Sequence, residues 1–165
     1  MTRRPPRVVA LTGAIASAVV LALAHGSETW AELVPCALCL WERWPYRIAF
    51  LLGVGAMLLP PVHARLLVWL MILVLAAGAA LGFVHVGVEF GWWPSPLPEC
   101  AAPRLSTGSI ADRFAAMPAR PAKPCDEPAF LIPGLPLSMA AMNFLYSLAL
   151  AAALAIRQLE WRFRR

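Results

Sequence analysis

The hydrophobic residues of this chain fall into four long stretches with few or no charged side chains. These stretches cover residues 8–26, 41–60, 66–88 and 138–156. A spanning helix needs roughly 20 apolar residues to cross a hydrocarbon core of about 30 Å. The pattern therefore predicts an all-α membrane protein, a four-transmembrane-helix bundle, with Ser138 as the N-cap of the last helix.

Charged residues interrupt the start of the second stretch. Its helix is expected to begin upstream, near Cys39 or Trp41. Glu42, Arg43 and Arg47 would then lie at the membrane interface, where the stems of long side chains can cover apolar surface.

The first stretch allows a second interpretation. Arg3, Arg4 and Arg7 precede an apolar run that ends at Ala24, which resembles a cleavable signal peptide. The run is longer than the usual apolar core of a signal peptide, so we favour a retained span.

The distribution of arginine predicts the orientation. Basic residues are retained on the cytoplasmic side. With both termini inside, arginine dominates the cytoplasmic segments against the single acid Glu160: Arg3, Arg4, Arg7, Arg65, Arg157, Arg162, Arg164 and Arg165. Acids outnumber bases in the two external loops, at about 27–40 and 89–137. We therefore expect a multi-pass protein with both termini cytoplasmic.

The composition agrees with this class. Hydrophobic residues make up 61% of the chain and charged residues 14%, with a mean hydropathy of +0.69. Residues 1–165 leave room for a single integral membrane domain. The pI of about 9.6 follows from the topology and gives no reason to invoke nucleic acid.

All four cysteines fall in the two external loops. Cys36 and Cys39 lie in the first, and Cys100 and Cys125 lie in the second. Disulfides persist in oxidising compartments such as the bacterial periplasm. Cysteines used only for packing would be expected among the helices as well. The placement therefore points to sulfur chemistry at one membrane face.

Three interpretations compete for these thiols. Structural disulfides suit the second pair, because closing a loop of this length stabilises it by about 3 kcal/mol. The Cys-x-x-Cys spacing of the first pair favours thiol–disulfide exchange instead. A four-cysteine zinc site is the third, although zinc sites of that type more often use two close pairs. Spacing and topology favour redox exchange and no metal.

Arg43 adds to the redox interpretation. If the second helix begins near Cys39, Arg43 lies one turn further on the same face. Its guanidinium and the positive helix end would favour a thiolate at Cys39 and would steady an anionic acceptor. An interfacial arginine that snorkels or pairs with Glu42 is the alternative.

The segment Cys36-Ala-Leu-Cys39-Leu-Trp-Glu42-Arg43 resembles the Cys-x-x-Cys-x-x-Glu-Arg signature of the DsbB family of disulfide bond formation proteins. The four spans, the two external loops and the second cysteine pair are similar to that family as well. The resemblance covers nearly the whole chain.

The resemblance implies a bacterial inner-membrane quinone reductase that reoxidises a soluble, periplasmic, thioredoxin-fold thiol oxidase of the DsbA type. Its electrons would pass to the respiratory quinone pool, as ubiquinone or menaquinone. By position, the partner's thiolate would attack Cys100, and the released Cys125 would form an interloop disulfide with Cys36. Cys39 would then be the thiolate that faces the quinone, with Arg43 supporting quinone binding.

His85 lies near the outer end of the third span, where the family has a histidine close to its quinone pocket. An interfacial histidine with a backbone partner is the alternative. Many members carry a glutamine four residues later, whereas this chain has Glu89. Gly78 and Gly82 form a small-x-x-x-small pattern that predicts close helix packing.

The long second loop is rich in proline, and a short helix is expected between Ser109 and Met117. This helix would lie on the bilayer surface or pack against the bundle. Two other classes stay open: a non-catalytic membrane scaffold whose loops are stapled by disulfides, and a metal-binding membrane protein.

Overall fold

The computed structural model describes residues 6–100, 109–111, 123–132 and 134–163, with side chains up to Glu160. It contains four long helices: α1 (Pro6–Thr29), α2 (Ala37–Leu58), α3 (Pro61–Glu89) and α5 (Met139–Phe163). A short 3-10 turn, η1, covers Pro98–Cys100. The described residues form no β-strand, so the prediction of an all-helical protein is confirmed.

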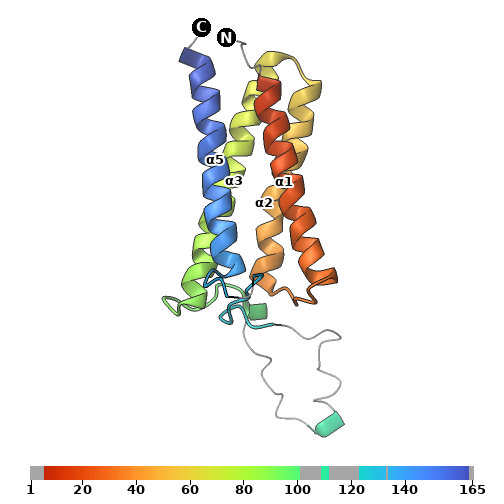
Figure 1. The fold of residues 1–165 in the computed structure, drawn as a ribbon, viewed down its shortest axis with the longest axis vertical. Coiled ribbons are helices and arrows are strands. Elements are labelled where there is room, and N and C mark those ends of the chain that lie inside the picture. Colours follow the sequence, from red (N-terminus) through yellow and green to blue (C-terminus); the bar gives the residue numbers. More distant parts are fainter. Residues whose placement is uncertain (1–5, 101–108, 112–122, 133, 164–165) are drawn as a thin grey trace.

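The four helices run side by side as one elongated bundle (Figure 1). Helix α1 begins and helix α5 ends at the same end of the bundle, and the cysteine-bearing connections lie at the other end. Helix α2 packs closely on α1 and α3, and α3 packs closely on α5. Helices α1 and α5 contact each other less, which leaves room between them near the cysteine end.

Three of the helices, α1, α3 and α5, are long and apolar enough to cross a membrane. Helix α2 differs because Glu42, Arg43 and Arg47 lie in its first half. It begins at Ala37, upstream of the charged residues as expected, but before the expected start near Cys39 or Trp41. Pro60 is the N-cap residue of α3, and Pro61 occupies its first turn. A proline is tolerated there because the N–H groups of the first turn have no hydrogen-bond partner within the helix.

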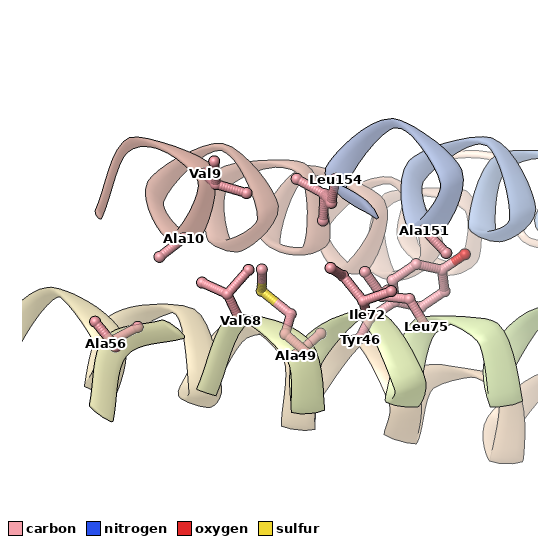
Figure 2. Close-up of a cluster of buried hydrophobic side chains, with 12 residues drawn as sticks. Val9, Ala10, Tyr46, Ala49, Ala56, Val68, Ile72, Leu75, Ala151 and Leu154 are labelled. Atoms are coloured by element: carbon pink, nitrogen blue, oxygen red, sulfur yellow. The ribbon is translucent and has the colours of Figure 1, made fainter. Parts of the chain in front are cut away.

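A core of small and branched apolar side chains joins the helices in the half of the bundle nearest the termini (Figure 2). Ala10, Ala49 and Val68 are fully buried there. Gly53 allows an especially close approach of α2 to α1, because a Cβ atom at this position would meet Ala14 Cβ at 2.8 Å and the Ala10 carbonyl oxygen at 2.9 Å.

The close packing predicted for Gly78 and Gly82 is confirmed. A Cβ at Gly78 would lie 2.9 Å from Pro45 Cβ on α2, and one at Gly82 would lie 3.0 Å from Phe144 Cα on α5. Both glycines therefore let the neighbouring helices approach α3.

Ser138 caps helix α5, as predicted, because its Oγ accepts a hydrogen bond from the Ala141 N–H at 3.2 Å. The Ser138 hydroxyl also donates to the Glu89 carboxylate at the end of α3. Most of the short helix expected between Ser109 and Met117 lies outside the described residues.

Candidate functional site

The site begins with Cys36, which is the N-cap residue of helix α2. Its sulfur accepts a hydrogen bond from the Cys39 N–H at 3.2 Å, so it satisfies one of the free amides of the first turn. The Cys39 sulfur lies 3.0 Å from the Cys36 sulfur, within hydrogen-bond distance. Both sulfurs are reduced in this structure.

This geometry lowers the pKa of the Cys36 thiol from its usual value. The hydrogen bond from the Cys39 side chain is the largest cause; burial opposes it, and the Cys39 backbone N–H adds to the lowering. Hydrogen bonds that favour the charged form of a group stabilise that form. Of the two thiols, Cys36 is therefore the one that loses its proton more readily, with Cys39 as hydrogen-bond donor to its charged form.

The prediction that the helix end favours a thiolate at Cys39 is wrong for the reduced pair. The helix begins at Ala37, two residues earlier than expected, so its free amides point at Cys36. Cys39 lies inside the first turn, donates its backbone N–H to Cys36, and stabilises the charged form of Cys36 through its thiol. The role of Cys39 after Cys36 has entered a disulfide stays a prediction.

His85 lies directly behind Cys36. Its Nε2 is 3.5 Å from the Cys36 sulfur, and its Nδ1 is 2.8 Å from the Glu42 carboxylate. The side chains of His85 and Glu42 are 3% and 8% exposed, so both are removed from bulk water. Because an ionised carboxylate can only accept, Nδ1 carries a proton and donates it to Glu42, and Nε2 faces the Cys36 sulfur.

The sequence signalled His85 but missed its partner. Glu42 was considered only as a neighbour of Arg43, although it lies three residues after Cys39 and so on the same helix face. The sequence offered no signal that a residue from α3 would pack between Glu42 and Cys36.

Arg43 pairs with Glu28 near the end of helix α1, not with Glu42. The Arg43 side chain is 8% exposed and that of Glu28 is 27% exposed. The alternative of a snorkelling arginine does not fit so buried a side chain. The ion pair fixes the position of the guanidinium near the first turn of α2, which carries the two reduced thiols. It also connects α1 to α2.

Cys100 and Cys125 form a disulfide. They are 5% and 1% exposed and belong to the same buried cluster as Cys36, Leu38 and Val88. The backbones of Cys36 and Lys123, two residues before Cys125, pair as an isolated parallel β-bridge. The structure therefore brings together all four cysteines named from the sequence, and the four-thiolate zinc arrangement is not formed.

A cavity of about 290 Å³ opens on the other side of the Cys39 turn. Three helices line it: the last turns of α1 from Val19 to Ala24, the first turns of α2, and the start of α5. Cys39, Glu42 and Arg43 form one side of this cavity, and apolar residues dominate the remainder. Val19 and Leu23 of α1 and Tyr146 of α5 are exposed on the outer surface, so the cavity opens between these two helices.

His85 does not line this cavity. It lies on α3 and contacts a cavity-lining residue, Glu42, through its Nδ1. The structure thus separates the two residues that the sequence assigned to one cofactor site: Arg43 faces the cavity, and His85 faces the Cys36 sulfur.

Glu89 is held by the Ser138 hydroxyl at the start of α5. The side chain that replaces the glutamine common in the resembling family therefore has a hydrogen-bond donor. Like His85, Glu89 is not part of the cavity lining.

A helical bundle with membrane-type helices and four clustered cysteines at one end defines a membrane thiol–disulfide protein. A family model described as disulfide bond formation protein DsbB matches residues 6–157, and the chain belongs to this family. The family predicted from the sequence is confirmed, and it makes the chain a membrane disulfide-bond oxidoreductase. No curated protein and no solved structure matches the chain significantly.

Proposed function

We propose that the protein is a quinone reductase of the bacterial inner membrane. It reoxidises a soluble periplasmic thioredoxin-fold dithiol oxidase of the DsbA type and passes the electrons to the quinone pool. The observation that carries this proposal is the position of Cys39. It contacts Cys36 on one side, where the second disulfide is packed, and lines the cavity on the other.

The proposed topology follows the distribution of arginine. The chain is a single membrane domain, α2 is its fourth span, and both termini are cytoplasmic. The cysteine-bearing loops then face the periplasm, where thiols are oxidised. Labelling intact cells with a membrane-impermeant thiol reagent after reduction tests this orientation. Cytoplasmic cysteines would contradict it.

The exchange steps follow from the arrangement of sulfurs. The partner's thiolate attacks Cys100 and forms a mixed disulfide, and the Cys100–Cys125 bond breaks to leave a Cys125 thiolate. Cys125 then attacks Cys36 of an oxidised Cys36–Cys39 pair, which leaves Cys39 as the free thiolate. The partner's second thiolate breaks the mixed disulfide, which releases the oxidised partner and a Cys100 thiolate. Cys100 then attacks Cys125, re-forms the Cys100–Cys125 bond and frees Cys36, so that Cys36 and Cys39 are left as a dithiol. The packing of Cys36 against Cys100 and Cys125 in one cluster supports this order, because no sulfur has far to travel.

His85 and Glu42 handle the proton of Cys36 in this proposal. The Nε2 lone pair accepts the proton when Cys36 becomes a nucleophile and returns it when Cys36 leaves as a thiol. Glu42 orients the imidazole and stabilises its charged form, as the third residue of a catalytic triad does. A direct contact between His85 and quinone is therefore not part of the proposal.

The cavity suits a quinone in size and chemistry. Its volume of about 290 Å³ is near the lower end of the range for small-molecule sites. The apolar lining fits a ring and the start of an isoprenoid tail, which would leave between α1 and α5 toward lipid. Arg43 would bind a quinone oxygen and orient the ring against Cys39. When bound, quinone supplies the acceptor for two electrons and two protons from the Cys36–Cys39 dithiol.

The test is to mix the purified protein with quinone and a reduced thioredoxin-fold partner and to follow the quinone absorbance. We expect thiol-dependent loss of quinone by the wild-type protein, no activity in Cys39→Ser, and a large loss in Arg43→Gln. Arg47→Gln is the matched control, because Arg47 lies one turn further along α2, stacks on Trp44 and does not line the cavity.

Activity that survives Cys39→Ser would overturn the proposal. No thiol-dependent quinone loss in the wild-type protein would do the same and would favour the alternative class, a scaffold whose loops are stapled by disulfides. Circular dichroism of each variant shows whether the helical bundle is retained.

A further inference from the structure

Three side chains at the start of α2 and the end of α3 present a set of metal ligands. One donor atom from each of Cys36, Cys39 and His85 lies within 4.8 Å of the others. The two sulfurs are 3.0 Å apart, and His85 Nε2 is 3.5 Å from the Cys36 sulfur. Two cysteines and one histidine are the ligand set of zinc sites that keep a fourth position open.

Glu42 prepares His85 for this role. Its carboxylate oxygen lies 2.8 Å from His85 Nδ1, so the proton stays on Nδ1 and the lone pair of Nε2 is free. Histidines that bind metal almost always donate their other ring N–H to a carboxylate, a carbonyl or water, which fixes the ring orientation. The outer support of a metal site is therefore present together with its inner ligands.

The distances require one small adjustment. Tetrahedral zinc, with sulfur at about 2.3 Å and nitrogen at about 2.0 Å, places two sulfurs about 3.8 Å apart and a sulfur and a nitrogen about 3.5 Å apart. The pair of Cys36 and His85 already has this separation. The Cys39 sulfur must move by about 0.8 Å, a shift that a side-chain rotation supplies.

The surroundings accept both a fourth ligand and a positive charge. Cys39 lines the cavity, so a water molecule from the cavity can reach the open position. Arg43, the nearest cation on the same helix, is neutralised by Glu28. Glu42 adds a negative charge behind His85.

We propose that the reduced Cys36–Cys39 pair and His85 bind a thiophilic divalent ion such as Zn²⁺, and that oxidation of the pair removes the site. On binding, the metal takes the place of the thiol protons, which pass to water, and no electron is transferred. A Cys36–Cys39 disulfide removes both thiolate ligands, and a Cys36–Cys125 disulfide removes one. The metal thus binds only the reduced form and blocks its exchange, a consequence that rests on the proposed function.

The binding test uses the full chain in detergent with Cys100→Ser and Cys125→Ser, so that Cys36 and Cys39 are the only thiols. The reduced, chelator-treated protein is titrated with Co²⁺ without oxygen. We expect one Co²⁺ per chain, with a thiolate-to-cobalt absorption band and the visible bands of tetrahedral cobalt, and displacement by Zn²⁺. Oxidising the pair should abolish the spectrum without any further substitution.

Two variants distinguish metal binding by Cys36, Cys39 and His85 together from metal binding by the two thiolates alone. We expect His85→Gln to weaken binding by at least 10-fold, and Glu42→Gln to weaken it by roughly 10–100-fold. His63→Gln is the matched control, because His63 lies exposed at the opposite end of α3. Equal binding by His85→Gln, binding that survives oxidation, or no thiolate-to-cobalt band would overturn the proposal.

Activity assays distinguish a failure of the metal-site proposal from a failure of the proposed function. Quinone reduction by the wild-type protein in the presence of a chelator depends on the proposed function alone. Activity with a chelator but no Co²⁺ binding overturns only the metal site. If Zn²⁺ binds yet the reduced protein does not reduce quinone in either condition, only the proposed function is overturned.

Discussion

The two ends of the bundle are packed in different ways. Near the termini, helices approach each other through alanine and glycine, with Ala10, Ala49 and Ala56 fully buried. At the cysteine end, ionisable side chains are buried as well, and they are held in pairs, as Glu42 is with His85 and Arg43 with Glu28. Burying a charge is costly unless it is paired and hydrogen-bonded. The first end thus provides a fixed frame, and the second carries the reactive groups.

The largest expected effect comes from removing the base at the reactive end. His85→Gln should lower the rate of exchange through Cys36 by about 100-fold or more, because general base catalysis contributes at least that much. The loss should shrink as pH rises and Cys36 ionises without help. Stopped-flow measurement of exchange across a pH series checks this, and a pH-independent loss would indicate a structural role.

A single added methyl group at the end of the bundle near the termini should lower stability without altering the groups near the cysteines. Gly53→Ala forces a Cβ against Ala14 and the Ala10 carbonyl, so we expect a loss of about 1–3 kcal/mol in the free energy of unfolding. Gly55→Ala is the matched control, since its Cβ would meet only Leu67 Cδ1, at 3.4 Å. Denaturant unfolding in mixed micelles measures both. Equal stability of the two variants would contradict the contrast between the ends.

A smaller effect concerns the ionisation of Cys36. The pKa of Cys36 is lowered chiefly by the thiol donor of Cys39, so its thiolate persists as pH falls below 9.0, the ordinary thiol value. Without that donor the pKa rises, and the thiolate is lost at a higher pH. In a Cys100→Ser and Cys125→Ser background, Cys39→Ala should therefore shift the midpoint of the alkylation profile upward relative to Cys39→Ser, which keeps a hydroxyl donor. Identical profiles would refute the assignment.

The smallest effect is expected at Glu89. Glu89→Gln keeps an acceptor for the Ser138 hydroxyl and lies outside the cavity lining. We therefore expect an effect of about 0.5 kcal/mol or less, so that quinone reduction stays within about twofold of wild type. The quinone absorbance assay checks this. A large loss of quinone reduction would show that the Glu89 carboxylate contributes to the reaction.

The long helices and their close packing were largely predictable from the sequence. Charge-free stretches predicted the long helices, and Gly78 and Gly82 predicted their close approach, because both follow from local periodicity. The cysteines and Arg43 stood out through their spacing. The Glu28–Arg43 and Glu42–His85 pairs did not, because each joins residues from different helices whose rotation about their axes is set by packing.

The start of helix α2 was the other feature that local pattern could not define. The predicted start near Cys39 made that residue the thiolate, and the observed start at Ala37 transfers this advantage to Cys36. A shift of two residues turns a side chain through more than half a helical turn. Chemistry at a helix end therefore depends on a boundary that sequence periodicity locates only to within a few residues.

Cys36 is the N-cap of helix α2 and, in the proposed function, also exchanges disulfides. A thiolate is a strong acceptor for the Cys39 N–H, and a disulfide sulfur is a weak one, so each turnover slackens and retightens the first turn. That turn also carries the wall of the cavity at Cys39 and Glu42. The oxidation state of Cys36 would thereby alter the position of the α2 residues that line the neighbouring cavity.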